Sequence, residues 1–205
     1  MFLDRFAERL IALGVQVERA NEARLDIDER LRERHRHYLT LVHLEHLHAQ
    51  LLPVLDQLRD KDAVVLAIAY HDAVYDVKRS DNEERSAELA RTSLGPLGLG
   101  HALIDHCAAM ILATKAHTLS DDPDTDLFTD ADLSILGAPP EPYERYEVQV
   151  RKEYAIYPDL LYRPGRRKVL EHFLAMPRIF KTVYFRDLFE AQARINLREE
   201  LDRLG

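Results

Sequence analysis

The sequence predicts an all-α protein, and three observations point to that class. Long stretches place an apolar residue at every third or fourth position, the spacing of amphipathic helices. Few runs are rich in the Val, Ile and Thr that favour strands, and only 7 of the 205 residues are glycine. In the last third, Pro158, Pro164 and Pro177 recur at intervals that suit a helical bundle with short loops.

The first elements follow from this periodicity. Residues 2–13 are expected to form a short amphipathic helix. Residues 18–36 are highly charged with few apolar positions, which is typical of a solvated face or a mobile arm. A strong helix is expected over 38–58, with leucines at helical spacing. Asp62 is placed to cap the next helix, which continues to about residue 75.

Later elements are marked by caps and breakers. The run SDNE at 80–83 has the form of a capping box and opens a helix to about residue 94, which Gly95 and Pro96 end. A further helix is expected over 100–115 and an acidic loop over 121–126. The remaining helices are expected from Thr129 or Asp130 to Gly137, and over 144–157, 165–175 and 185–204.

A chain of 205 residues is long enough to bury one sizeable core. We therefore expect a single domain spanning 1–205. In it, 1–36 form an N-terminal helix and charged segment, about 38–137 form the core, and 139–205 form helices packed on that core.

Composition excludes several classes of protein. The chain has 28 Lys and Arg against 36 Asp and Glu, a net charge of −8, which argues against nonspecific binding to nucleic acid or acidic membranes. No apolar run reaches the roughly 18 residues of a spanning helix, and the N-terminus is unlike a secretory signal. The lone Cys107 cannot form an internal disulfide and is expected to be buried and inert. These features favour a cytoplasmic protein.

The most informative stretch is 66–76, where an apolar helical run ends in adjacent His71 and Asp72. Burying both side chains without partners would cost several kcal/mol, and a divalent cation would compensate them. His43 and Asp132, on other predicted helices, complete a set of two imidazoles and two carboxylates. Such a set suits octahedral Mn²⁺, Mg²⁺, Fe²⁺, Co²⁺ or Ni²⁺ with water in the open positions and lacks the thiolates of a structural zinc site.

The chain resembles the HD superfamily of metal-dependent phosphohydrolases, in particular a bacterial branch of predicted HD phosphohydrolases, over roughly 38–201. The matching stretches are HRHY at 35–38 through His43, YHDAVYD at 70–76, SDNEERSA at 80–87, ILATKAH at 111–117 and DADLSILG at 130–137. The resemblance implies an HD-domain-like helical bundle that holds one divalent metal ion through His43, His71, Asp72 and Asp132.

Two positions qualify the ligand set. The superfamily's last ligand usually follows an alanine, which favours Asp132 over Asp130; Asp130 would then cap a helix or accept a hydrogen bond beside the site. Members of the branch carry a histidine where this chain has Leu39. Leu39 and His43 lie one helical turn apart, so the change puts a second metal or a phosphate contact at that position in doubt.

Three residues are candidates for catalysis. The stretch from His71 to Asp76 is similar to the His-Asp-x-x-Glu-Asp of alarmone hydrolases, which implies that Asp76 orients or deprotonates the attacking water; a surface ion pair with Lys78 or Arg79 is the alternative. Family position assigns His117 to a phosphate contact or a second metal. Lys115 is an equally good phosphate partner.

The remaining candidates are weaker. Lys78, Arg79, Arg178 and Lys181 are placed to neutralise a phosphate or to serve as surface charges. His46 and His48 are predicted to be non-ligands. Asn82 and Glu83 belong to the capping box or border the pocket, and Tyr143, Tyr146 and Tyr154 are expected mostly in the core.

The predicted function is a metal-dependent phosphohydrolase acting on a small phosphorylated compound, with a nucleotide favoured. The metal would lower the pKa of a bound water near neutral pH, and the absence of a P-loop argues against transfer from ATP. Cleavage of a monoester, a pyrophosphate or a diester is equally compatible with the pattern. Two alternatives are a non-catalytic metal-containing ligand-binding or sensor module, and a two-iron oxygenase of HD fold that would use His37 and His117.

Overall fold

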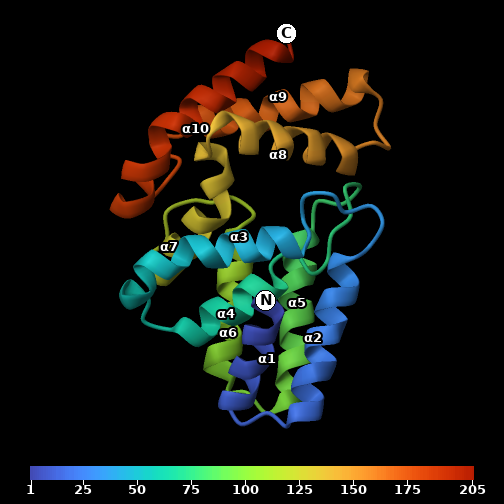
Figure 1. The fold of residues 1–205 in the computed structure, drawn as a ribbon, viewed down its shortest axis with the longest axis vertical. Helices are drawn as coiled ribbons and strands as arrows, with labels where there is room; N and C mark the ends of the chain where they lie inside the picture. The colour runs from blue at the N-terminus through green and yellow to red at the C-terminus, as the bar shows by residue number, and fades with distance from the viewer. The chain divides into compact units, whose positions relative to one another are not determined.

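The structure, a computed structural model, describes residues 1–205 and contains helices but no strand. The all-α prediction is therefore confirmed. The chain divides into two compact units, Met1–Thr129 and Asp130–Gly205, coloured from blue to yellow-green and from yellow to red in Figure 1. The expectation of a single domain stays a prediction.

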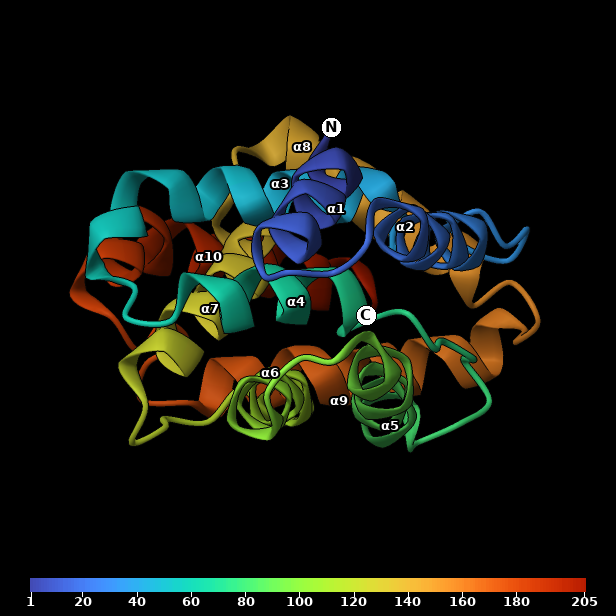
Figure 2. The ribbon, with the colours of Figure 1, turned by 90° about the horizontal axis from the view of Figure 1, so that it is seen from below.

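The first unit contains most of the helices. They are α1 (Phe2–Ala12), α2 (Val17–Leu31), α3 (Leu41–Leu51) with the 3₁₀ helix η1 (Leu52–Gln57), α4 (Lys61–Tyr70), α5 (Asn82–Leu94) with η2 (Gly95–Leu97), α6 (His101–Ala113) and the start of α7 (Pro123–Leu133). The helices α5 and α6 pack side by side, and Figure 2 shows them end-on.

Helix α4 is the centre of this unit. It contacts α1, α3, α5 and α6, and its residues from Ala63 onwards are almost all buried. A helix that is apolar all round can only be stable when it is surrounded by protein. The ring of Tyr70 packs edge-on against Phe6. His71 and Asp72 directly follow this buried helix and therefore lie at the end of an apolar core.

The second unit is built around a long C-terminal helix. Its elements are η3 (Ser134–Gly137), α8 (Pro140–Glu153), α9 (Asp159–Ala175) and α10 (Val183–Arg203). Gly137 lets η3 approach α10 closely, because a Cβ there would lie 2.5 Å from the Cβ of Phe189. Asn196 of α10 donates to the carbonyls of Leu136 and Ala138, both at 2.8 Å.

A buried ion pair stabilises the second unit. Both carboxylate oxygens of Glu200 accept from Arg166, at 2.6 and 2.9 Å, and the hydroxyl of Tyr143 donates to Glu200 at 2.6 Å. Arg166 also donates to the hydroxyl of Tyr146. The predicted core positions of Tyr143 and Tyr146 are confirmed, while Tyr154 is half-buried.

Two elements of the first unit differ from the prediction because of side-chain contacts. Of the two interpretations of residues 18–36, the mobile arm is wrong, because α2 packs on α1 and buries Ala20, Ile27 and Leu31. The solvated face is confirmed, since the other residues of α2 are exposed or half-buried. Helix α4 ends at Tyr70 rather than near residue 75. Its N-terminal cap is Asp60, whose Oδ1 accepts from the backbone N of Ala63 at 2.9 Å, and not Asp62.

Three further differences concern acidic and proline residues. The acidic run 121–126 is not a loop, since Asp122 accepts from the backbone and hydroxyl of Thr125 and so caps α7, which begins at Pro123. Proline at the first helical position and carboxylates in the first turn favour this start. Pro164 lies inside α9 instead of separating two helices. At 80–83 Asp81 occupies the N-cap position of α5 without a side-chain cap bond.

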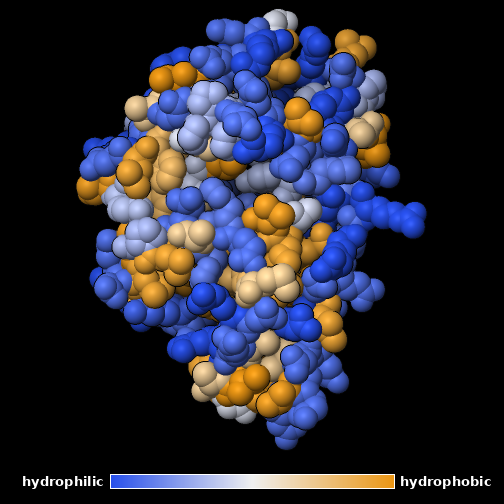
Figure 3. Space-filling view, in the orientation of Figure 1, coloured by the Kyte–Doolittle hydropathy of each residue, from blue (hydrophilic) through white to orange (hydrophobic).

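The surface agrees with the high content of charged residues, 31% of the chain. The face shown in Figure 3 is mostly hydrophilic, with separate apolar patches. No helix combines the length and apolar character needed to cross a membrane.

Candidate metal centre

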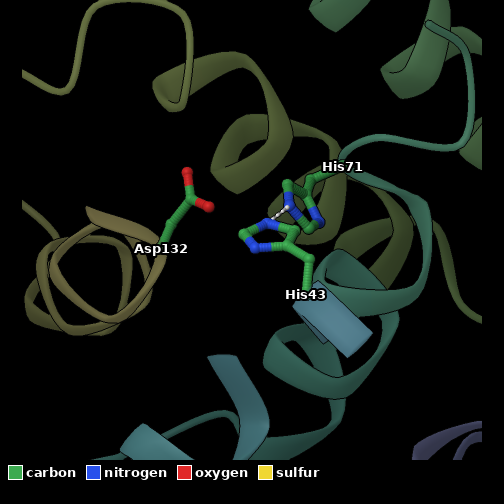
Figure 4. A group of neighbouring side chains, drawn as sticks. All are labelled: His43, His71 and Asp132. Carbon is green, nitrogen blue, oxygen red and sulfur yellow. Dashed lines mark hydrogen bonds between the residues drawn. The ribbon is translucent and has the colours of Figure 1, made fainter. Parts of the chain in front are cut away.

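Three predicted ligands meet in the structure. His43 of α3, His71 after α4 and Asp132 in the last turn of α7 each offer one ligand atom, and these atoms all lie within 4.8 Å of one another (Figure 4). Both histidines are buried and Asp132 is half-buried. Residues far apart in the sequence thus form a group that could hold a metal ion.

The two imidazoles have the spacing of ligands to one ion. The Nε2 atoms of His43 and His71 are 3.1 Å apart. Two atoms bound side by side to one ion at about 2.1 Å lie about 3 Å apart. The Nδ1 of His71 is 3.1 Å from the carbonyl of Ile68, which can only accept. That Nδ1 therefore carries a proton, and in the neutral ring this leaves the Nε2 lone pair of His71 directed at the group.

Asp72 lies against both imidazoles. Its Oδ2 is 3.0 Å from the Nε2 of His71 and 3.5 Å from the Nε2 of His43. Neighbouring residues of a helix point about 100° apart, yet the side chains of Asp72 and of His71, the C-cap of α4, converge here. Asp72 is not part of the three-residue group of His43, His71 and Asp132, so its place as a fourth ligand stays a prediction. Mixed nitrogen and oxygen ligands such as those of the group suit first-row divalent cations.

Asp130 has a different role from Asp132. Its buried carboxylate accepts from the backbone N of Lys181 at 2.9 Å and from the backbone N and hydroxyl of Thr182 at 2.8 and 2.7 Å. The ammonium of Lys181 lies 3.2 Å from the same carboxylate. Asp130 thereby holds the start of α10 in place. It does not cap the helix expected to begin at Thr129 or Asp130, because α7 begins at Pro123 and contains both residues. Lys181, a candidate phosphate contact in the sequence, is instead buried against Asp130.

The structure does not place Asp76 in the group of His43, His71 and Asp132. Because α4 ends at Tyr70, Asp76 is not one helical turn beyond Asp72. Its Oδ1 accepts from the backbone N of Lys78 at 2.9 Å, and the side chain of Asn82 bonds its backbone N and O.

Arg79 does not form the alternative surface pair with Asp76. It makes two 2.6 Å hydrogen bonds to Asp81 instead. The role of Asp76 as a base therefore stays a prediction.

Lys115 and His117 also lie outside the group. The ammonium of Lys115 donates to Glu84 and to the carbonyl of Ser80, and the hydrogen bond to Glu84 raises the pKa of Lys115. His117 is the only non-glycine residue with a positive φ, 50°. Its backbone N donates to the carbonyl of Ala113 at 3.0 Å and ends the turn after α6.

His46 and His48 are outside the group of ligands, and the ring of His48 packs against Phe2. Arg178 is exposed. Cys107 is buried, as predicted, and burial raises the pKa of its thiol, which keeps the sulfur protonated and unreactive.

Sequence reasoning missed two polar contacts that position the ligand-bearing helices. The buried guanidinium of Arg36 donates to the carbonyl of Asp72 at 2.6 Å. His106 of α6 bridges Asp60 and Asp122, at 3.0 and 2.9 Å, and these carboxylates cap α4 and α7. The only signal for Arg36 was its place between two histidines, and nothing marked His106 in the sequence.

Comparisons with known proteins found no matching protein-family model, no matching curated protein and no matching solved structure.

Proposed function

We propose that this chain is a metal-dependent phosphohydrolase of the HD type, acting on a small phosphorylated substrate, with a nucleotide favoured. The observation that carries the proposal is the convergence of His43, His71 and Asp132 from three separate helices, with Asp72 against both imidazoles. This is the ligand order, His, His-Asp, Asp, of the resemblance described above. The HD-like form of the bundle is part of the same proposal.

The four ligands would hold one divalent cation, such as Mn²⁺, Mg²⁺, Fe²⁺, Co²⁺ or Ni²⁺. When bound, a cation of this kind polarises a phosphoryl oxygen and lowers the pKa of a coordinated water. The carboxylates of Asp72 and Asp132 would neutralise the positive charge of the ion. The Ile68 carbonyl fixes the ring of His71, so that its Nε2 stays available as a ligand.

The remaining proposed roles belong to Asp76, His117 and Lys115. Asp76 or His117 would accept the proton of the attacking water. Lys115 would have to leave Glu84 and Ser80 before it could bind a phosphate, so it is the least suited of the three to act in the resting arrangement.

The proposal is tested by measuring phosphate release from a panel of nucleotides and sugar phosphates with each of the five metals. We expect release that a chelator abolishes and that the Asp132→Asn variant lacks. The matched control is Asp126→Asn, which removes a buried acid from the same helix. Metal binding without any release would contradict catalysis and support the alternative of a ligand-binding module, which Leu39 and the engaged Lys115 favour.

A further inference from the structure

Arg36 is the most completely buried cation near the candidate metal centre. Its side chain has 0% exposure, although it follows the charged helix α2. A guanidinium taken out of water is costly unless its N–H groups are hydrogen-bonded. The partners of Arg36 therefore show what holds it in place.

Those partners come from two segments, the one just before α3 and the one that carries Asp72. One terminal nitrogen of Arg36 donates to the carbonyl of Asp72 at 2.6 Å and to that of Leu39 at 3.4 Å. The other donates to the carbonyl of Ala73 at 3.2 Å, and Nε donates to Glu33 at 3.0 Å. The guanidinium also lies over the ring of Tyr75, 5.6 Å from its centre.

These bonds act where the buried helix ends. Helix α4 ends at Tyr70 with His71 as its C-cap, so later backbone N–H groups do not take up the carbonyls of Asp72 and Ala73 in a continued helix. The side chain of Arg36 donates hydrogen bonds to these carbonyls instead. Its planar fork reaches both carbonyls at once, which the single ammonium of a lysine cannot do. The backbone of Asp72 is thereby tied to the segment that leads into α3 and His43.

We propose that Arg36 is a positioning residue of the metal centre, which holds the Asp72 carboxylate against the imidazoles of His43 and His71. The inference rests on the proposed function for its metal, but not on the reaction performed there. The inference also predicts the direction of the change in metal affinity when Arg36 is replaced. Loss of a nearby positive charge alone would strengthen the binding of a cation, whereas loss of positioning weakens it.

The test compares Arg36→Lys and Arg36→Gln with the control Arg32→Gln. The control removes an exposed arginine at the C-terminal end of α2 that pairs with Asp28 of that helix. The probe is Co²⁺ alone, with its dissociation constant measured by chelator competition. Outer partners of metal ligands typically change affinity by about 10–100-fold. We expect Co²⁺ binding to weaken by about tenfold or more in Arg36→Gln, to weaken less in Arg36→Lys, and to be unchanged in Arg32→Gln.

A second measurement needs no metal. Imidazole ¹⁵N signals of the metal-free protein report the surroundings of His43 and His71, and both Arg36 variants should shift them while Arg32→Gln does not. If Arg36→Gln does not fold, Arg36→Lys decides, because it keeps the charge. Unchanged ring signals and equal or tighter Co²⁺ binding in a folded Arg36→Lys would overturn the inference. An absence of phosphatase activity would count only against the proposed function.

Discussion

At the scale of single residues, the two acids at 130 and 132 show how position on one helix separates a cap from a ligand. Asp130 and Asp132 lie two residues apart, so they point to different sides of α7. Asp130 accepts hydrogen bonds from the backbone at the start of α10. Asp132 offers a ligand atom within 4.8 Å of those of His43 and His71. The alanine between them was the only sequence signal for this choice, and the resemblance supplied its meaning.

This difference predicts opposite responses to the same substitution. Asp132→Asn should lose metal with little change in the unfolding of the metal-free protein. Asp130→Asn should keep metal, while the free energy of unfolding falls by at least about 1 kcal/mol, the usual contribution of a cap. Metal titration and urea denaturation of both variants would measure the two effects. Metal loss in Asp130→Asn alone would mean that the ligand has been assigned to the wrong acid.

His117 occupies a backbone conformation that costs an L-residue about 1–2 kcal/mol. At φ 50° a glycine would be relaxed. We expect His117→Gly to exceed His117→Ala in free energy of unfolding by about 1 kcal/mol, as urea denaturation would show. The alanine variant serves as the control, because it removes the imidazole and keeps the strain. Equal stability of the two variants would show that the backbone at 117 is not strained.

At the scale of elements, His106 connects the beginnings of two helices that carry predicted ligands at their ends. Asp60 caps α4, which leads to His71, and Asp122 caps α7, which carries Asp132. Burial opposes a charge on His106, but hydrogen bonds to Asp122 and Asp60 outweigh it and raise the pKa of His106. On the neighbouring α5, Arg91 pairs with Asp105, the residue before His106, at 3.9 Å.

The raised pKa of His106 predicts how stability changes with pH. The folded state holds a proton on His106 that the unfolded state releases above about pH 6.5. The stabilisation is therefore complete below that pH and is lost as the pH rises through the folded pKa. We expect the His106→Gln variant to lack this decline, which amounts to roughly 1 kcal/mol for a partly exposed pair. Urea denaturation from pH 6 to 9 measures the free energy of unfolding of both proteins. The same pH dependence in His106→Gln as in the unaltered chain would refute a contribution from His106.

At the scale of the whole molecule, the sequence predicts the class and most of the helices, because amphipathic spacing and proline breaks are local signals. It misplaces elements where a distant side chain decides. Helix α4 stops at Tyr70 where Arg36 takes the carbonyls of Asp72 and Ala73, and α7 starts at Pro123 because Asp122 caps it. The ligands were found through the resemblance, whereas the contacts of Arg36 and His106 span distances along the chain that no local pattern records.

His43, His71, Asp72 and Asp132 are proposed to bind one divalent metal ion. The most direct measurement is the metal content of the purified chain, by elemental analysis, beside those of His71→Ala and the control His46→Ala. His71 supplies one of only two imidazoles in the group, and His46 lies outside it. We predict about one equivalent of metal in the unaltered chain and in His46→Ala, and almost none in His71→Ala. Undiminished metal in His71→Ala would contradict the assignment.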